Sequence, residues 1–265
     1  MNKLYIFIIS IFLSLNIGKA STEGMDMVLK GEEQEEISTS SNSSQGNNND
    51  TLLGDKFLET IKKDIEGDTL HCFVFNIGQG NFVVLKFNKN ILIIDCGSSA
   101  IIWDKFYEKN EEVINAIFKE SSIKAVVVTH PDEDHYNVLE SLFATTTLDE
   151  KCIFVVGRKN KNDHKFFTAY LKKNNLKNTV YTVESEVSTK TTIYDDVNKD
   201  LTTALFDKSD GIGIVEILEP VYQISREDTN SHSLVLKVIY DKQSILFTGD
   251  ATKETFEAIY GDAKK

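Results

Sequence analysis

The sequence predicts an α+β fold in which two β-sheets pack against each other and helices lie outside them. Three observations lead to this prediction. A block of short strands rich in Val, Ile and Phe comes first, strand–helix units follow it, and a hairpin and a helix close the chain. With 265 residues, the chain is long enough for one sizeable core or at most two small ones.

The folded part is expected to begin with a helix and a meander of strands. Apolar residues at helical spacing predict a helix over 52–65. Three short apolar runs separated by turn residues then predict antiparallel strands over 70–77, 82–87 and 91–95. This block supplies one sheet of the predicted fold.

Helices and buried strands alternate in the middle of the chain. A helix over about 103–119 leads into the run 123–129, which is apolar except for Lys124 and is expected to be buried on both faces. A further helix follows it. Cys152 to Val156 is predicted as a second buried strand.

The last third of the chain gives a weaker pattern. A helix is expected near 163–174 and a strand near 179–184, while 185–213 is polar and hard to assign, although 201–206 favours a strand. Three strands and a closing helix are expected after it, over 215–218, 233–240, 244–248 and 252–260.

Residues 1–20 have the form of a secretory signal peptide. Lys3 precedes an apolar run from Leu4 to Ile17, and the small residues Gly18 and Ala20 predict cleavage after Ala20. The alternative is an uncleaved anchor, but the run falls short of the ~20 residues that a spanning helix needs. We therefore expect no stable membrane span after cleavage, and a protein that is secreted or lies in the periplasm or outside the cell.

Residues 21–51 are polar and acidic, which predicts a disordered linker, so the folded domain is expected over 52–265. The chain has 29 Lys and Arg against 41 Asp and Glu, a net charge of −12. This balance excludes coating of nucleic acid by bulk charge, but not a local site where a metal ion handles a phosphate. Three cysteines are too few for a disulfide framework, although the sequence allows one disulfide, between Cys72 and Cys96.

Four potential metal ligands fall within six residues: His130, Asp132, Asp134 and His135. They follow a buried strand, and the carboxyl end of such a strand is where sites assemble in α/β architectures. An extended loop can aim His130 and Asp132 inward together, and Asp134 and His135 fall in the first turn of the next helix. Two such clusters suit two metal ions. A helix cap, the alternative, explains one acid but not two acids and two histidines.

Two further acids end apolar strands elsewhere in the chain. Asp250 follows the run 245–247, and Gly249 lets the backbone approach closely, so this carboxylate is a candidate bridge between two cations. Asp95 follows the run 92–94 and precedes Gly97. It is expected either to accept a hydrogen bond from a metal-ligating histidine or simply to form a turn.

These residues together resemble the metallo-β-lactamase fold and, within it, the ComEC-like branch. The matching stretches lie in the family's order at 75–81, 94–97, 129–135, 230–236 and 247–251. The resemblance implies a four-layer αββα sandwich that holds one or two divalent metal ions, Zn²⁺ or Mn²⁺, at the sheet edge. The metal ligands that it implies are His130, Asp132, Asp134, His135 and Asp250. It also implies that Asp134 orients or deprotonates the attacking water, and that the reaction is phosphodiester hydrolysis, often of DNA.

Three departures from the family pattern bear on this expectation. Asp132 stands where many members have a histidine; ComEC-like members share this acid, which favours a harder ion such as Mn²⁺. Asn81 replaces the Asp that usually follows Gly-Gln-Gly, and the loss of this charge is expected to weaken the support of the site. The chain stops at Lys265, before the further strand and the His-bearing loop of the family, so we expect a sandwich lacking its last strand or strands, or a truncated chain. His232 is a candidate substitute for the missing ligand.

The sequence thus predicts an exported metal-dependent hydrolase that cleaves a phosphodiester or another ester by a metal-activated water. The expected partner is nucleic acid or another phosphoester, and the sequence does not indicate an oligomeric state. The missing ligand and Asn81 favour an alternative from another class, a non-catalytic secreted binding protein. Hydrolysis of a lactam or thioester is a third option that Asp132 disfavours.

Overall fold

The structure is a computed structural model. It describes residues 3–9, 69–99, 103–158, 169, 172–173, 178–184, 192–207, 213–220, 224 and 228–261. The predicted linker 21–51 and the predicted helix 52–65 lie outside these residues, as does most of the predicted helix 163–174.

Within the described residues, the larger sheet has seven strands that follow one another in sequence order. They are β1 (Lys3–Ile9), β2 (Thr69–Phe75), β3 (Gly80–Phe87), β4 (Asn90–Ser98), β5 (Ser122–Val128), β6 (Leu148–Arg158) and β7 (Val180–Glu184). The strands β2, β3 and β4 form the predicted antiparallel meander. The pairs from β4 to β7 are parallel, so β4, β5, β6 and β7 have their carboxyl ends at one edge of the sheet.

The smaller sheet is antiparallel, with β9 in its centre. Its strands are β8 (Gly213–Ile217), β9 (Leu236–Tyr240) and β10 (Gln243–Phe247). The hairpin from β9 to β10 turns at Asp241, which has a positive φ of 52°. This left-handed conformation is one that Asp adopts more readily than most residues.

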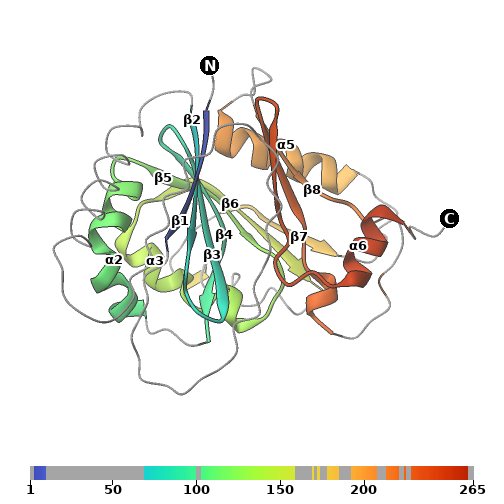
Figure 1. Ribbon diagram of the computed structural model, residues 1–265, viewed down its shortest axis with the longest axis horizontal. Helices are drawn as coiled ribbons and strands as arrows, with labels where there is room; N and C mark the ends of the chain where they lie inside the picture. Colours follow the sequence, from blue (N-terminus) through green and yellow to red (C-terminus); the bar gives the residue numbers. More distant parts are fainter. Residues whose placement is uncertain are drawn as a thin grey trace, which may run out of the picture.

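Helices lie on both sides of the two sheets (Figure 1). The helices α2 (Trp103–Phe118) and α3 (Leu139–Thr145) pack on one face of the larger sheet. The helices α5 (Thr192–Phe206) and α6 (Lys253–Tyr260) lie on the side of the smaller sheet. Ile214 and Leu246 of the smaller sheet remain 47% and 40% exposed, so α5 and α6 flank this sheet without covering all of its outer face. The predicted α+β fold of two packed sheets and outer helices is confirmed.

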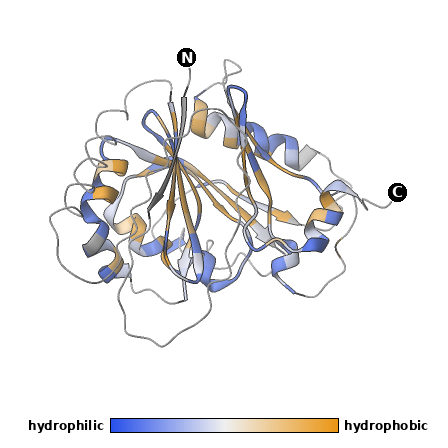
Figure 2. Ribbon diagram, viewed as in Figure 1, coloured by the Kyte–Doolittle hydropathy of each residue, from blue (hydrophilic) through white to orange (hydrophobic). Residues whose placement is uncertain are grey.

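The larger sheet is buried on both faces, which explains why its strands are so apolar (Figure 2). In β5, Val126 and Val128 face α2 and α3, whereas Ala125 and Val127 face the smaller sheet and α5. All four are fully buried. The prediction that this strand has two buried faces is confirmed.

Successive side chains of a strand in the larger sheet point alternately into the core beneath α2 and α3 and into the core between the two sheets. This alternation decides whether Cys72 and Cys96 can form a disulfide. Cys72 belongs to the core between the sheets, whereas Cys96 belongs to the core beneath α2. The three cysteines, Cys152 included, are free and buried. A bridge between Cys72 and Cys96 is therefore excluded, because their side chains lie on opposite faces of one sheet.

The expected strand over 201–206 was wrong, because these residues form the end of helix α5. Tyr194, Val197, Leu201 and Leu205 recur at intervals of three and four residues, and all four are buried in the core between the sheets. The short run Leu201 to Phe206 looks like a strand in isolation. The helical period appears only when the polar residues before it are included, because one face of α5 remains in solvent.

The strand β1 is a second unexpected element. Its residues fall within the predicted signal peptide, yet they pair in parallel with β2 from Lys3 opposite Thr69 to Ile9 opposite Phe75. Cleavage after Ala20 stays a prediction, and it would remove β1 and leave β2 at the edge of the sheet. Among the helices in the described ranges, none combines the length and the apolar content needed to cross a bilayer.

Candidate metal centre

The candidate centre begins where β5 ends. Thr129 and His130 follow the strand as buried residues, and the chain then turns into the short 3₁₀ helix η1 (Glu133–His135). His130 and His135 are 0% and 1% exposed, so the loop returns both imidazoles to the interior. This return follows from the local sequence, in which the two histidines bracket Pro131 and three acidic residues.

Two glycines allow the η1 loop to lie on the meander. A Cβ atom at Gly97 would lie 2.5 Å from the carbonyl carbon of Asp134, and one at Gly80 would lie 2.7 Å from its oxygen. Asn137 fixes the same contact, because its side chain accepts a hydrogen bond from Ser98 N at 2.9 Å and donates one to Ser98 O at 2.8 Å. The glycines of two separate sequence stretches therefore position the loop that carries the histidines.

His130, His135 and Asp250 converge on one point. One ligand atom of each lies within 4.8 Å of those of the other two. The Nε2 atom of His135 lies 3.5 Å from Asp250 Oδ1, and the two imidazole ring centres are 4.0 Å apart. Asp250 follows β10, so the smaller sheet brings this carboxylate to a loop of the larger one. The structure thus joins three of the predicted ligands across a separation of about half the chain.

These residues fit a divalent metal ion. The Nε2 atom of His130 is buried and has no hydrogen-bond partner among the described residues, which is costly unless another ligand satisfies it. It lies 3.5 Å from Asp132 Oδ2, so nitrogen and carboxylate oxygen donors are close together. Imidazole and carboxylate are the donors that Zn²⁺ and Mn²⁺ take in proteins.

Asp95 contacts His135 on Nδ1, the ring nitrogen that does not face Asp250. Its side chain is fully buried and its φ is +55°, a strained conformation that persists only where the surroundings enforce it. Its Oδ1 accepts a hydrogen bond from Thr129 N at 2.7 Å. Its Oδ2 accepts one from Thr129 Oγ1 at 2.9 Å and lies 2.9 Å from His135 Nδ1. This contact leaves Nε2 of His135 facing Asp250 and the centre.

The unusual Asn81 also has a partner here. Its amide Nδ2 donates a hydrogen bond to Asp95 Oδ2 at 3.1 Å. A carboxylate at this position would instead face the carboxylate of Asp95 at short range, which is unfavourable. Asn81 therefore supports Asp95 in this chain, in contrast to the weaker support expected from its sequence.

The ionisable side chains of the centre shift one another's pKa values. Burial lowers the pKa of His135, but hydrogen bonds to Asp250 and Asp95 outweigh it and raise the pKa to about 10. The hydrogen bond from His135 lowers the pKa of Asp250. Burial, together with the charge of His135, lowers the pKa of His130. These directions favour a His135 imidazolium with hydrogens on both ring nitrogens beside a neutral His130, so we expect a cation that binds His135 to displace a proton.

Asp132 and Asp134 stand apart from the group of three. The side chain of Asp132 is 39% exposed, and its Oδ2 accepts a hydrogen bond from Thr229 Oγ1 at 2.8 Å. Asp134 is half-buried, its backbone carbonyl packs against Gly80 and Gly97, and its carboxylate is not in the group. The predicted metal-binding roles of both residues, and the predicted catalytic role of Asp134, stay predictions.

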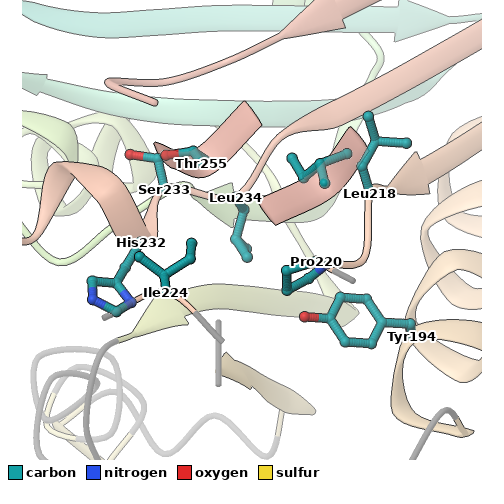
Figure 3. A pocket seen from close by; sticks show the side chains of 9 residues that line it. Tyr194, Leu218, Pro220, Ile224, His232, Ser233, Leu234 and Thr255 are labelled. Carbon is teal, nitrogen blue, oxygen red and sulfur yellow. The ribbon is translucent and has the colours of Figure 1, made fainter. Parts of the chain in front are cut away.

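His232 is not in the group either. It is 3% exposed and lines a small, mostly apolar pocket with Tyr194, Ile224 and Leu234 (Figure 3). Its neighbour Ser233 approaches the centre instead, with Oγ 3.2 Å from His130 Nδ1. Sequence analysis missed Thr129, Thr229 and Ser233 as supporting residues. Thr129 adjoins His130 in sequence, but the other two become visible only through the packing of the sheets.

The sequence profile of the Metallo-beta-lactamase superfamily matches residues 76–262, a range that contains every residue of the candidate centre. The chain belongs to the metallo-β-lactamase superfamily. Members of this superfamily typically bind divalent metal ions, as the group of His130, His135 and Asp250 is suited to do. No curated protein sequence matches the chain.

A comparison with solved structures gives matches of low sequence identity. Human tRNase Z, short form, has a TM-score of 0.38 and 13% sequence identity, over 68% of this chain and 67% of its own. The metallo-β-lactamase fold protein YhfI from Bacillus subtilis has a TM-score of 0.32 and 12% identity, over 64% and 55%. A putative metallo-β-lactamase from Thermotoga maritima has a TM-score of 0.31 and 21% identity, over 65% and 68%.

Proposed function

We propose that the protein is an exported metal-dependent hydrolase of the ComEC-like type, which cleaves a phosphodiester or another ester. The observation that carries this proposal is the convergence of His130, His135 and Asp250 from two sheets around a buried Nε2 atom that has no hydrogen-bond partner among the described residues. Buried polar groups are rarely left unsatisfied, except where a ligand or chemistry requires them.

In this proposal, His130, His135 and Asp250 hold Zn²⁺ or Mn²⁺, and Asp132 adds a further oxygen. The chemistry that a divalent ion supplies when bound is polarisation of the ester and acidification of a water molecule. Asp95 keeps His135 turned toward the centre through the 2.9 Å contact with its Nδ1 atom. Asp134 is half-buried and immediately precedes His135, and in this proposal its carboxylate takes up the proton of the attacking water.

The acidic surroundings of the centre make the reaction depend on a cation. Asp132 and Asp250 are partly exposed at its mouth, with side chains 39% and 46% accessible. Two carboxylates would repel an anionic phosphodiester at close range unless positive charge neutralises them. We therefore propose hydrolysis that is strictly metal-dependent, with nucleic acid or another phosphoester as the substrate class.

The test uses the purified protein after removal of metal and reloading with Zn²⁺ or Mn²⁺. Turnover of bis(p-nitrophenyl) phosphate and p-nitrophenyl acetate is measured together with bound metal by elemental analysis. The proposal expects turnover that a chelator abolishes and that His130→Ala removes. Failure to bind either metal would eliminate the proposed hydrolase.

A second candidate function is a non-catalytic secreted binding protein. It is favoured by the position of the Asp134 carboxylate outside the group of His130, His135 and Asp250. Tight metal binding without turnover above the His130→Ala background, for any ester tested, would support this alternative over the hydrolase.

A further inference from the structure

A turn that precedes strand β9 of the smaller sheet contacts two side chains of the loop 130–135, which carries the candidate metal ligands. This turn consists of the 3₁₀ helix η2 (Asn230–His232) and its flanking residues Thr229 and Ser233. Thr229 Oγ1 donates a hydrogen bond to Asp132 Oδ2 at 2.8 Å. Ser233 Oγ lies 3.2 Å from His130 Nδ1. Each end of the turn therefore contacts one side chain of the pair formed by His130 and Asp132.

The hydroxyl groups next to His130 bear on which of its two ring nitrogens carries the lone pair that can bind a metal ion. Thr129 Oγ1 donates its only hydrogen to Asp95 Oδ2, so toward His130 Nδ1, at 3.2 Å, it can only accept. A proton on His130 Nδ1 can therefore be donated to Thr129 Oγ1 and Ser233 Oγ, both 3.2 Å away, and this is the tautomer that the two contacts favour. The lone pair is left on Nε2, the atom that is buried without a hydrogen-bond partner in the described part of the chain.

The η2 turn is itself held rigidly. Asp228 Oδ1 accepts a hydrogen bond from Ser231 N at 2.7 Å. On the other side, Thr255 Oγ1 of α6 donates to Ser231 O at 2.8 Å. Leu234 N donates to Thr129 O at 2.8 Å, which joins the end of the turn to the residue before His130. A turn fixed on both sides can hold a partly exposed carboxylate that would otherwise change rotamer freely.

We propose that Thr229 and Ser233 are positioning residues of the metal centre: Thr229 holds the carboxylate of Asp132, and Ser233 holds the imidazole of His130 with Nε2 toward the ion. This inference rests on the proposed metal centre and extends it to the η2 turn. Partners of this kind typically contribute 10–100-fold to metal affinity. The affinity of the centre thus depends on the packing of the two sheets as well as on the ligands.

The test measures the affinity of the full chain for Zn²⁺ and Mn²⁺ by competition with a chromophoric chelator. Thr229→Val, which keeps the shape but removes the hydroxyl, should weaken binding by about 10–100-fold, whereas Thr229→Ser should stay within about threefold of the wild type. Ser233→Ala should weaken binding by about tenfold, because Thr129 still accepts from His130. Thr203→Val and Ser244→Ala, at exposed sites on α5 and β10, are the matched controls and should not change affinity.

A double-mutant cycle separates positioning from general loss of structure. If Thr229 acts through Asp132, Thr229→Val should have little further effect in an Asp132→Asn background. Nitrogen chemical shifts of His130 should show its proton on Nδ1 in the wild type, and a mixture of tautomers in Ser233→Ala.

The outcomes distinguish this inference from the proposed function. Wild-type affinity in Thr229→Val and Ser233→Ala, with affinity lost in His130→Ala, would overturn the positioning roles and leave the metal centre intact. Full additivity in the cycle would overturn the role of Thr229. Absence of metal binding by the wild type would overturn both the inference and the proposed function. If Thr229→Val does not fold, the comparison of Thr229→Ser with Thr229→Ala decides the same question.

Discussion

Asp250 is the one member of the group that reaches the centre from the other sheet, and its Oδ1 lies 3.5 Å from His135 Nε2. Asp250→Asn should weaken metal binding by more than about 100-fold, because loss of an indirect partner alone costs 10–100-fold. The matched control is Asp241→Asn, an exposed acid in the turn between β9 and β10. Equal metal affinity in Asp250→Asn and the control, measured by chelator competition, would show that Asp250 is not a ligand.

Asp95 concentrates more of the centre's hydrogen bonds than any other side chain discussed above. Asn keeps its shape and tolerates the positive φ, but its amide nitrogen accepts no hydrogen bond and so cannot replace Oδ2 opposite Thr129 Oγ1 and His135 Nδ1. Asp95→Asn should therefore weaken metal binding by about 10–100-fold while the protein still folds. Circular dichroism checks the fold, and chelator competition checks the affinity. Unchanged affinity would mean that His135 binds metal without the contact between its Nδ1 atom and the Asp95 carboxylate.

At the scale of elements, contact between the meander and η1 depends on Gly97. Gly97→Ala would place a methyl group 2.5 Å from the Asp134 backbone, so η1 must shift. We expect a loss of about 1–3 kcal/mol of unfolding free energy, measured with denaturant, together with weaker metal binding. Gly261→Ala is the comparison, because Gly261 has a positive φ of 76° with nothing near it. It should lose stability without any change in metal affinity.

Lys86 of β3 contacts the end of α2, on the face of the larger sheet that α2 covers. It is 1% exposed, and its Nζ donates to Ile117 O at 2.5 Å and to Ser121 Oγ at 2.7 Å. Burial lowers the pKa of Lys86 to about 8 from 10.5, while the charge of Glu120 opposes this shift. The unfolded chain thus binds more protons than the folded protein between these two pH values.

This difference predicts how stability changes with pH. Between pH 8 and 10.5, the unfolding free energy of the wild type should rise relative to that of Lys86→Met, because the folded protein no longer buries a charged ammonium group. Below pH 8, the difference between the two proteins should stay constant. Denaturant titrations across this range provide the measurement, and a constant difference from pH 7 to 10.5 would contradict the lowered pKa.

At the scale of the whole molecule, β1 and the centre lie far apart in the larger sheet. The strand order places β2, β3 and β4 between β1 and β5, the strand that leads to His130. A protein that begins at Ser21 should therefore fold and bind metal like the full chain, and the secreted protein should begin at Ser21. N-terminal sequencing and chelator competition check these two outcomes. An aggregated or metal-free product from the chain beginning at Ser21 would show that β1 belongs to the mature fold.

The fold and the centre were predictable from sequence to different extents. The apolar period of β2 to β6 and the glycines beside the site are local features, so the meander, the buried strand β5 and the loop with two histidines were predicted correctly. The helix α5 was missed because its polar first half hides the period that its buried face follows. The pairing of β1 was missed because an apolar run near a chain start fits a signal peptide equally well.

By itself, the sequence determined which metal-ligating side chains are available, because two histidines and three acids in one short loop can be recognised from their spacing alone. The tertiary structure alone decided which of these groups meet. Asp95 contacts His135 across 40 residues, and Ser233 contacts His130 across 103. The first contact depends on the pairing of β4 with β5, and the second on how the two sheets pack. No local pattern encodes either arrangement, because a side chain's neighbours from distant parts of the chain are set by the whole fold.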